Sequence, residues 1–189
     1  MAEVLLFHHA QGLTPGVVAF ADELRAAGHS VHTPDLYEGK TFATVEEGVE
    51  NARQIGFGNV LERGVAAAQD LPAELVYAGF SLGGMPAQML AQTREGARGA
   101  LLFHAAIPLS EFGGAWPEGA PLQIHFMEDD PWAEEDLDAA REIVDAVDGA
   151  ELFLYPGDKH LFADSSVADY EPEAAALLKQ RALALLERV

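Results

Sequence analysis

The 189-residue chain has no cysteine. A disulfide framework, a thiolate metal site and a thiol nucleophile are therefore excluded. Long hydrophobic runs are also missing, since no apolar stretch approaches the ~20 residues that a helix needs to cross a bilayer. The first residues, MAEVLLFHHAQG, have neither the basic segment nor the cleavage site of a signal peptide. From these absences we expect a cytoplasmic protein that does not attach to a membrane.

Basic residues are scarce. Eleven Lys and Arg stand against 31 Asp and Glu, which gives a formal net charge of −20. Binding to a duplex depends on neutralising several phosphates with clustered cations, so a surface this acidic repels nucleic acid. We expect no nucleic-acid partner, and the charge alone does not choose a substrate.

The apolar segments alternate with amphipathic ones along the whole chain, without a repeat or a linker. We expect one domain over residues 1–189. Strands are expected at 3–9, near 29–33, at 75–78, from 99 to about 104, at 121–127 and at 150–155. Helices are expected at 15–27, at 44–70 with a break near 56–58, after 84, after the acidic loop at 128–130, and from 172. This alternation predicts an α/β fold, a mostly parallel sheet with helices on both faces. Ligands of such sheets bind beyond the carboxyl ends of the strands.

The segment YAGFSLGG, residues 77–84, places Ser81 between Gly79 and Gly83 directly after an apolar strand. The pattern G-x-S-x-G is typical of a nucleophile elbow, in which a sharp strand-to-helix turn exposes the serine hydroxyl. A glycine-rich turn that happens to hold a serine would look the same. The rest of the chain must distinguish the two.

A serine nucleophile needs a histidine base and a carboxylate that orients it, and an elbow predicts the chain order Ser, acid, His. Glu128, Asp129 and Asp130 follow one strand, and His160 follows the next. Residue type, order and position at strand ends all agree with a catalytic triad. Chemistry alone does not rank the three acids.

The other histidines fit the base less well. His8 and His9 end the first strand and are expected to point to opposite faces, so they do not chelate one metal together. His104 could line the site, but a hydrogen-bonded packing role is the stronger expectation. His125 is out of phase with the inward residues of its strand and is expected to pack under a helix.

Two binding sites are weighed and rejected. The acidic run MEDDPWAEEDLD lacks the alternate spacing and central glycine of a calcium loop, and it suits the first turn of a helix. The segment GFSLGG lacks the spacing of a dinucleotide-binding turn. We therefore expect neither a metal nor a cofactor.

Five segments together resemble the dienelactone hydrolase family of α/β-hydrolases, over nearly the whole chain: VLLFHHAQGL, HTPDLYEGKTF, YAGFSLGGMPA, IHFMEDDPW and LYPGDKHLFAD. The resemblance implies an α/β-hydrolase fold, here with the antiparallel N-terminal hairpin trimmed. Matched to the family's acid, the fourth of these segments, IHFMEDDPW, selects Asp130. Ser81 stands where the founding enzymes have cysteine, His9 where they have a glutamate, and Asp164 where they have an arginine that binds the substrate carboxylate.

These observations predict a serine hydrolase that cleaves a small ester or lactone through an acyl-enzyme intermediate. Ser81, Asp130 and His160 would be catalytic, and the N–H groups of Leu82 and Ala10 would stabilise the oxyanion. Residues expected to shape the substrate pocket are His9, Tyr37, Trp132, Phe162 and Asp164. For all of them except Asp164, packing in the loops is an equal alternative.

The acidic composition and Asp164 predict a preference for neutral substrates over carboxylate-bearing ones. Two other functions stay open. One is a non-catalytic relative that binds a small ligand, and the other is acyl transfer or thioester cleavage on the same scaffold. The oligomeric state is left undetermined.

Overall fold

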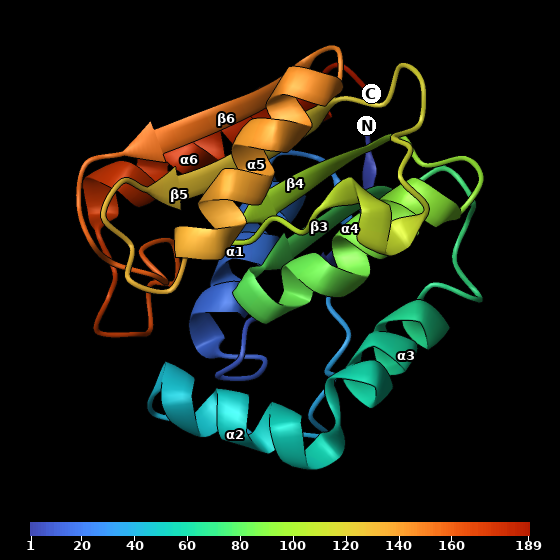
Figure 1. Ribbon diagram of the computed structural model, residues 1–189. Helices are drawn as coiled ribbons and strands as arrows, with labels where there is room; N and C mark the ends of the chain where they lie inside the picture. The colour runs from blue at the N-terminus through green and yellow to red at the C-terminus, as the bar shows by residue number, and fades with distance from the viewer.

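The computed structural model describes residues 1–189, and its six strands form one sheet (Figure 1). The strands are β1 (Glu3–Phe7), β2 (Ser30–His32), β3 (Val76–Phe80), β4 (Gly99–Phe103), β5 (Leu122–Met127) and β6 (Ala150–Tyr155). Their order across the sheet is β2-β1-β3-β4-β5-β6, and all five pairings are parallel. The predicted α/β-hydrolase architecture is confirmed, and no antiparallel strand pairs with this sheet.

Helices cover both faces of the sheet. They are α1 (Pro15–Ala26), α2 (Val45–Ile55), α3 (Phe57–Ala67), α4 (Gly84–Thr93), α5 (Glu134–Ala146) and α6 (Pro172–Leu186), with short 3₁₀ turns η1 (Ser81–Gly83) and η2 (Leu109–Phe112). One buried cluster joins the sheet to α1 and α6, and a second joins it to α2, α3, α4 and α5. In Figure 1, α4 and α5 lie in front of the sheet and α1 and α6 behind it. None of the helices combines the length and the apolar character that crossing a bilayer requires.

Local sequence explains where the helices begin and end. Thr14 caps α1 by accepting a hydrogen bond from the Val17 N–H at 3.3 Å, and Pro15 fills the first position. Gly28 follows that helix with φ +96°, a conformation that favours glycine. The predicted helix over 44–70 is divided at Gly56, whose φ of +91° ends α2 and starts α3.

The carboxyl ends of the central strands bring distant loops together. Phe7 of β1 pairs in register with Gly79 of β3, so the loop that follows β1 lies beside the Ser81 turn. β1 is shorter than predicted, because it ends at Phe7 and leaves His8 and His9 in that loop. This edge of the sheet holds every residue of the site described next.

Candidate active site

Ser81 occupies a turn that only small neighbours allow. Its φ is +48°, in the left-handed region that residues other than glycine rarely adopt. A Cβ at position 79 would lie 2.1 Å from the Gly83 carbonyl oxygen, and one at position 83 would lie 2.6 Å from the Phe7 and His8 carbonyl oxygens. The glycines therefore let η1 fold back against β1 and β3, with Ser81 at the corner.

Ser81, His160 and Asp130 form a continuous hydrogen-bonded chain. The Ser81 Oγ lies 2.8 Å from His160 Nε2, and His160 Nδ1 lies 2.7 Å from Asp130 Oδ2. Since an ionised carboxylate only accepts, Nδ1 carries the proton and Nε2 is free to accept from the hydroxyl. The histidine and aspartate are each only 5% exposed. This is the arrangement in which a histidine can remove a serine proton.

The structure distinguishes the three candidate acids. Glu128 and Asp129 are exposed, and their backbone N–H groups bond to the β6 strand and the loop that follows it. Asp130 is turned inward, and its second carboxylate oxygen accepts from the Trp132 N–H at 2.9 Å. Both oxygens of Asp130 therefore have partners, which fixes the carboxylate against His160.

The two predicted oxyanion donors belong to the Ser81 turn and to the neighbouring loop after β1. Leu82 directly follows the serine and belongs to η1. Ala10 lies in the loop after β1, is 1% exposed, and its N–H donates to no acceptor in the chain. Buried backbone N–H groups without a partner are rare in native proteins. Such a group beside the nucleophile turn is available to an oxygen of a bound substrate.

Most of the predicted pocket residues are buried. His9, Tyr37, Phe162 and Asp164 are all 1% exposed or less, which agrees for the first three with the alternative expectation that they pack in the loops. Their rings fill the core beneath the loops. For example, the Tyr37 and His8 rings pack edge to face with their centroids 5.0 Å apart. Trp132 differs, because it is 44% exposed and its ring lies 6.1 Å from the His160 ring.

Asp164 is the centre of a second buried network. His9 Nε2 lies 2.7 Å from Asp164 Oδ2, and the Thr14 hydroxyl donates to the same oxygen. The Ser166 N–H and hydroxyl donate to Oδ1, each at 2.7 Å. Burial alone would raise the pKa of Asp164, but these donors outweigh it and lower the pKa to about 2. The carboxylate is thus ionised inside the protein, where these donors surround it.

Sequence reasoning missed Asp136, in the first turn of α5. Its carboxylate accepts from the Ala106 N–H at 3.3 Å, in the loop after β4, and it lies within electrostatic reach of His160 and Asp130. Burial raises the pKa of Asp136 to about 6. The sequence carries no signal of this role, because acidic residues are common in the first turn of any helix.

The expectation that His104 is a hydrogen-bonded packing residue is wrong in one respect. Its ring is buried and packs edge to face on Phe162 at 4.7 Å, but neither ring nitrogen has a partner. Burial lowers the pKa of His104 well below its usual value, and the neighbouring His160 acts in the same direction. His104 is therefore a neutral side chain whose ring centroid lies 5.8 Å from that of His160. His125, expected to pack under a helix, packs against Phe103 of β4 and Phe153 of β6, and its Nδ1 lies 2.9 Å from the Tyr155 hydroxyl.

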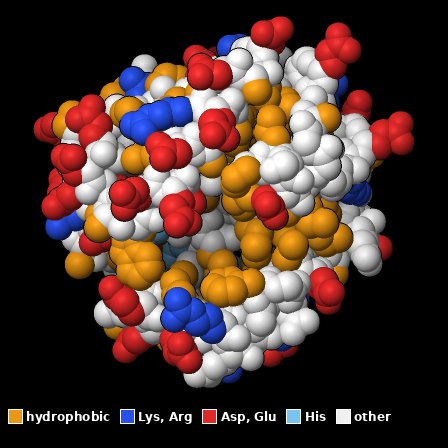
Figure 2. Space-filling view, in the orientation of Figure 1, with side chains coloured by type: hydrophobic (Ala, Val, Ile, Leu, Met, Phe, Trp, Pro, Cys, Tyr) orange, Lys and Arg blue, Asp and Glu red, His pale blue; other side chains and the backbone are white.

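Hydrophobic side chains gather on one part of the face shown in Figure 2. Figure 2 shows hydrophobic side chains gathered around a recess in which histidine atoms are visible, with acidic side chains spread over the surrounding surface. An apolar recess with a few fixed polar groups is suited to a small organic molecule.

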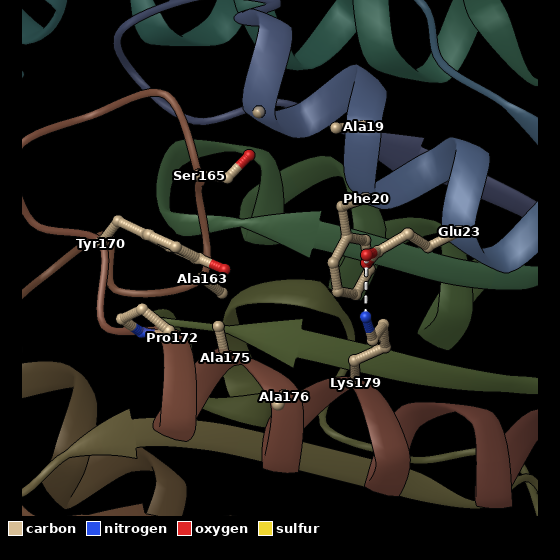
Figure 3. Close-up of a pocket in the computed structure, with 11 residues that line it drawn as sticks. Ala19, Phe20, Glu23, Ala163, Ser165, Tyr170, Pro172, Ala175, Ala176 and Lys179 are labelled. Carbon is tan, nitrogen blue, oxygen red and sulfur yellow. Dashed lines mark ion pairs between the residues drawn. The ribbon is translucent and has the colours of Figure 1, made fainter.

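A separate small cavity of about 70 Å³ lies between α1 and α6 (Figure 3). Phe20 and Tyr170 border it, and the Glu23–Lys179 ion pair at 2.8 Å spans its rim. It holds none of the triad residues, and its volume suits a few water molecules rather than a substrate.

Comparisons with known proteins agree with this fold. A dienelactone hydrolase from Anabaena variabilis has the same fold, with a TM-score of 0.70, 20% identity, and coverage of 100% of this chain and 86% of the other. A dienelactone hydrolase-like promiscuous phosphotriesterase from metagenomic libraries gives a TM-score of 0.78 at 19% identity, covering 100% and 86%. Esterase 2 of Thermogutta terrifontis gives 0.63 at 18%, covering 99% and 83%. No curated protein matches the chain.

The fold and the comparisons define a hydrolase of the α/β type. The sequence model described as the dienelactone hydrolase family matches residues 1–189, so the chain belongs to the dienelactone hydrolase family. Membership implies a small-molecule substrate.

Proposed function

We propose that this protein is a serine hydrolase that cleaves small esters or lactones through an acyl-enzyme. The supporting observation is the hydrogen-bonded chain from Ser81 through His160 to Asp130, with distances of 2.8 and 2.7 Å. His160 removes the Ser81 proton as the hydroxyl oxygen attacks the substrate carbonyl, and Asp130 stabilises the imidazolium that forms. His160 then gives the proton to the leaving alkoxide.

Deacylation repeats these steps with water. His160 activates a water molecule, which attacks the acyl carbon, and Ser81 leaves with the proton that His160 returns. Each attack puts a negative charge on the former carbonyl oxygen. The N–H groups of Leu82 and Ala10 are the proposed donors to this oxygen, and losing one such donor typically costs about 3–4 kcal/mol of transition-state stabilisation.

The proposed substrates are neutral on the acyl side. Asp164 no longer supports this preference, since it is buried and occupied by four donors. Asp136 supports it instead, because its carboxylate lies within electrostatic reach of His160. With its pKa at about 6, Asp136 is mostly ionised at pH 8, and a carboxylate bound nearby would be repelled.

The test is a screen of p-nitrophenyl esters of increasing chain length together with neutral and anionic lactones. We expect turnover of short neutral substrates, a loss of at least about 1,000-fold in kcat for Ser81→Ala, and a lower kcat/KM for dienelactone than for a neutral lactone of similar size. Asp136→Asn should narrow that last difference at pH 8. Binding without turnover, at the same affinity in Ser81→Ala, would favour a non-catalytic role.

A further inference from the structure

In the loop after β1, the Ala10 N–H has no acceptor within the chain, and its direction is fixed by the peptide it belongs to. Within the His9–Ala10 peptide, the His9 carbonyl oxygen accepts from the Gly12 N–H at 3.0 Å and is 2.8 Å from His8 Nδ1. A peptide bond is planar and this one is trans, so the Ala10 N–H points away from that oxygen. Whatever holds the His9 carbonyl therefore also aims the Ala10 N–H.

The hydrogen bonds of the two histidines define their tautomers. The Leu36 N–H donates to His8 Nε2 at 2.9 Å, so the His8 proton is on Nδ1 and is donated to the His9 carbonyl. The Gln11 N–H donates to His9 Nδ1 at 3.2 Å, so the His9 proton is on Nε2 and is donated to Asp164. Each ring thus uses both nitrogens, either to hold the backbone directly or to bind Asp164.

Asp164 joins this loop to the loop of the catalytic base. Its partners come from the β1 loop (His9), from the cap of α1 (Thr14) and from its own loop (Ser166). The Asp164 N–H also donates to the Leu161 carbonyl at 3.0 Å, one residue after His160. The proposed oxyanion donor and the proposed base are thus connected through one buried carboxylate.

Helix α2 packs against the loop at the Ala10 carbonyl. A Cβ at Gly48 would lie 2.0 Å from the Ala10 carbonyl oxygen, so the helix backbone packs directly against Ala10. His8, meanwhile, ties the loop to Leu36, beyond the end of β2. The loop is therefore held at two successive carbonyl groups, those of His9 and Ala10.

From these contacts we propose that His8, His9 and Asp164 are positioning residues that lock the His9–Ala10 peptide with its N–H directed at the oxyanion formed on Ser81. This rests on the proposed function, since the oxyanion arises only if Ser81 is acylated. None of the three side chains touches the substrate. Their role is to preorganise a donor, which reduces the reorganisation needed when charge develops.

The test uses paired variants. His9→Gln keeps an N–H that can reach Asp164, and His8→Asn keeps an N–H that can reach the His9 carbonyl, whereas His9→Leu and His8→Leu remove these donors. On a short p-nitrophenyl ester, we expect the leucine variants to lose roughly 10- to 100-fold in kcat with KM within about threefold, and the amide variants to recover most of it. The Ki of a trifluoromethyl ketone, whose serine adduct carries an oxyanion, should rise in parallel with the loss of kcat/KM.

His125→Leu is the matched control, because it removes another buried histidine, which lies in β5 and does not contact the loop after β1. It should lower stability without changing Ki. A crystal structure of His9→Leu supplies a readout independent of activity, and we expect the His9–Ala10 peptide to be rotated. An unmoved peptide, or folded leucine variants with wild-type kcat and Ki, would overturn the proposal. An inactive wild type, matched by Ser81→Ala, would overturn the proposed function, while the crystal structure would still decide whether the histidines hold the peptide.

Discussion

Two histidine–aspartate pairs lie at the carboxyl edge of the sheet, and they differ in what the histidine holds. In both, a ring nitrogen lies 2.7 Å from a carboxylate oxygen, and both pairs are buried. His160 turns its other nitrogen to a side chain, the Ser81 hydroxyl. His9 turns its other nitrogen to the backbone, the Gln11 N–H. A histidine–aspartate pair can therefore provide a general base in one loop and hold the backbone in place in another.

The largest expected effect separates the first pair from its acidic neighbours. Asp130→Asn should lower kcat by roughly 10⁴-fold, because an amide stabilises the wrong imidazole tautomer and no imidazolium. Asp129→Asn, which changes an exposed carboxylate one residue away, should stay within about threefold of the parent. Steady-state kinetics on a short aryl ester measures both. A reversed ranking would place the orienting acid one residue earlier.

Replacing the aspartate of the second pair, Asp164, should lower the stability of the protein and not only its activity. The folded pKa of Asp164 is about 2 and its ordinary value is 3.8, so its ionised form stabilises the fold above pH 4, and this contribution is lost as the pH falls toward 2. Asp164→Asn should lower the free energy of unfolding by about 2 kcal/mol at pH 7, and by progressively less below pH 4. Denaturant titrations at pH 7, 4 and 3 measure the difference. If the difference in unfolding free energy between Asp164→Asn and the wild type does not shrink in acid, the variant is destabilised by poor packing of the asparagine amide and not by the lost charge.

Sequence patterns predicted the first pair and missed the second for a physical reason. Ser81, Asp130 and His160 each stand in a local signal, an elbow or a strand end, and their chain order follows the fold. His9 and Asp164 are 155 positions apart, and only the folded sheet brings them together. The family resemblance predicts a pocket residue at Asp164, because its position matches a substrate-binding arginine, but hydrogen bonds to its carboxylate hold the side chain inside the protein.

The fold was more predictable than the interior of the site. The alternation of apolar and amphipathic segments depends on burial averaged over many residues, so the strands, the caps at Thr14 and Gly28 and the break at Gly56 followed from it. Whether a ring after a strand end lines a recess or fills the core depends on individual packing. Tyr37 and Phe162 proved to be core residues, while Trp132 stayed exposed.

The central claim is that His160 activates Ser81 and no other serine. Incubating the folded protein with a fluorophosphonate probe and mapping the adduct by peptide mass spectrometry tests it directly, since only an activated serine attacks such a phosphorus centre. We predict one adduct per chain, at Ser81, which forms orders of magnitude more slowly in Asp130→Asn. Labelling at Ser110 or Ser165, or no labelling of the folded wild type, would contradict the account.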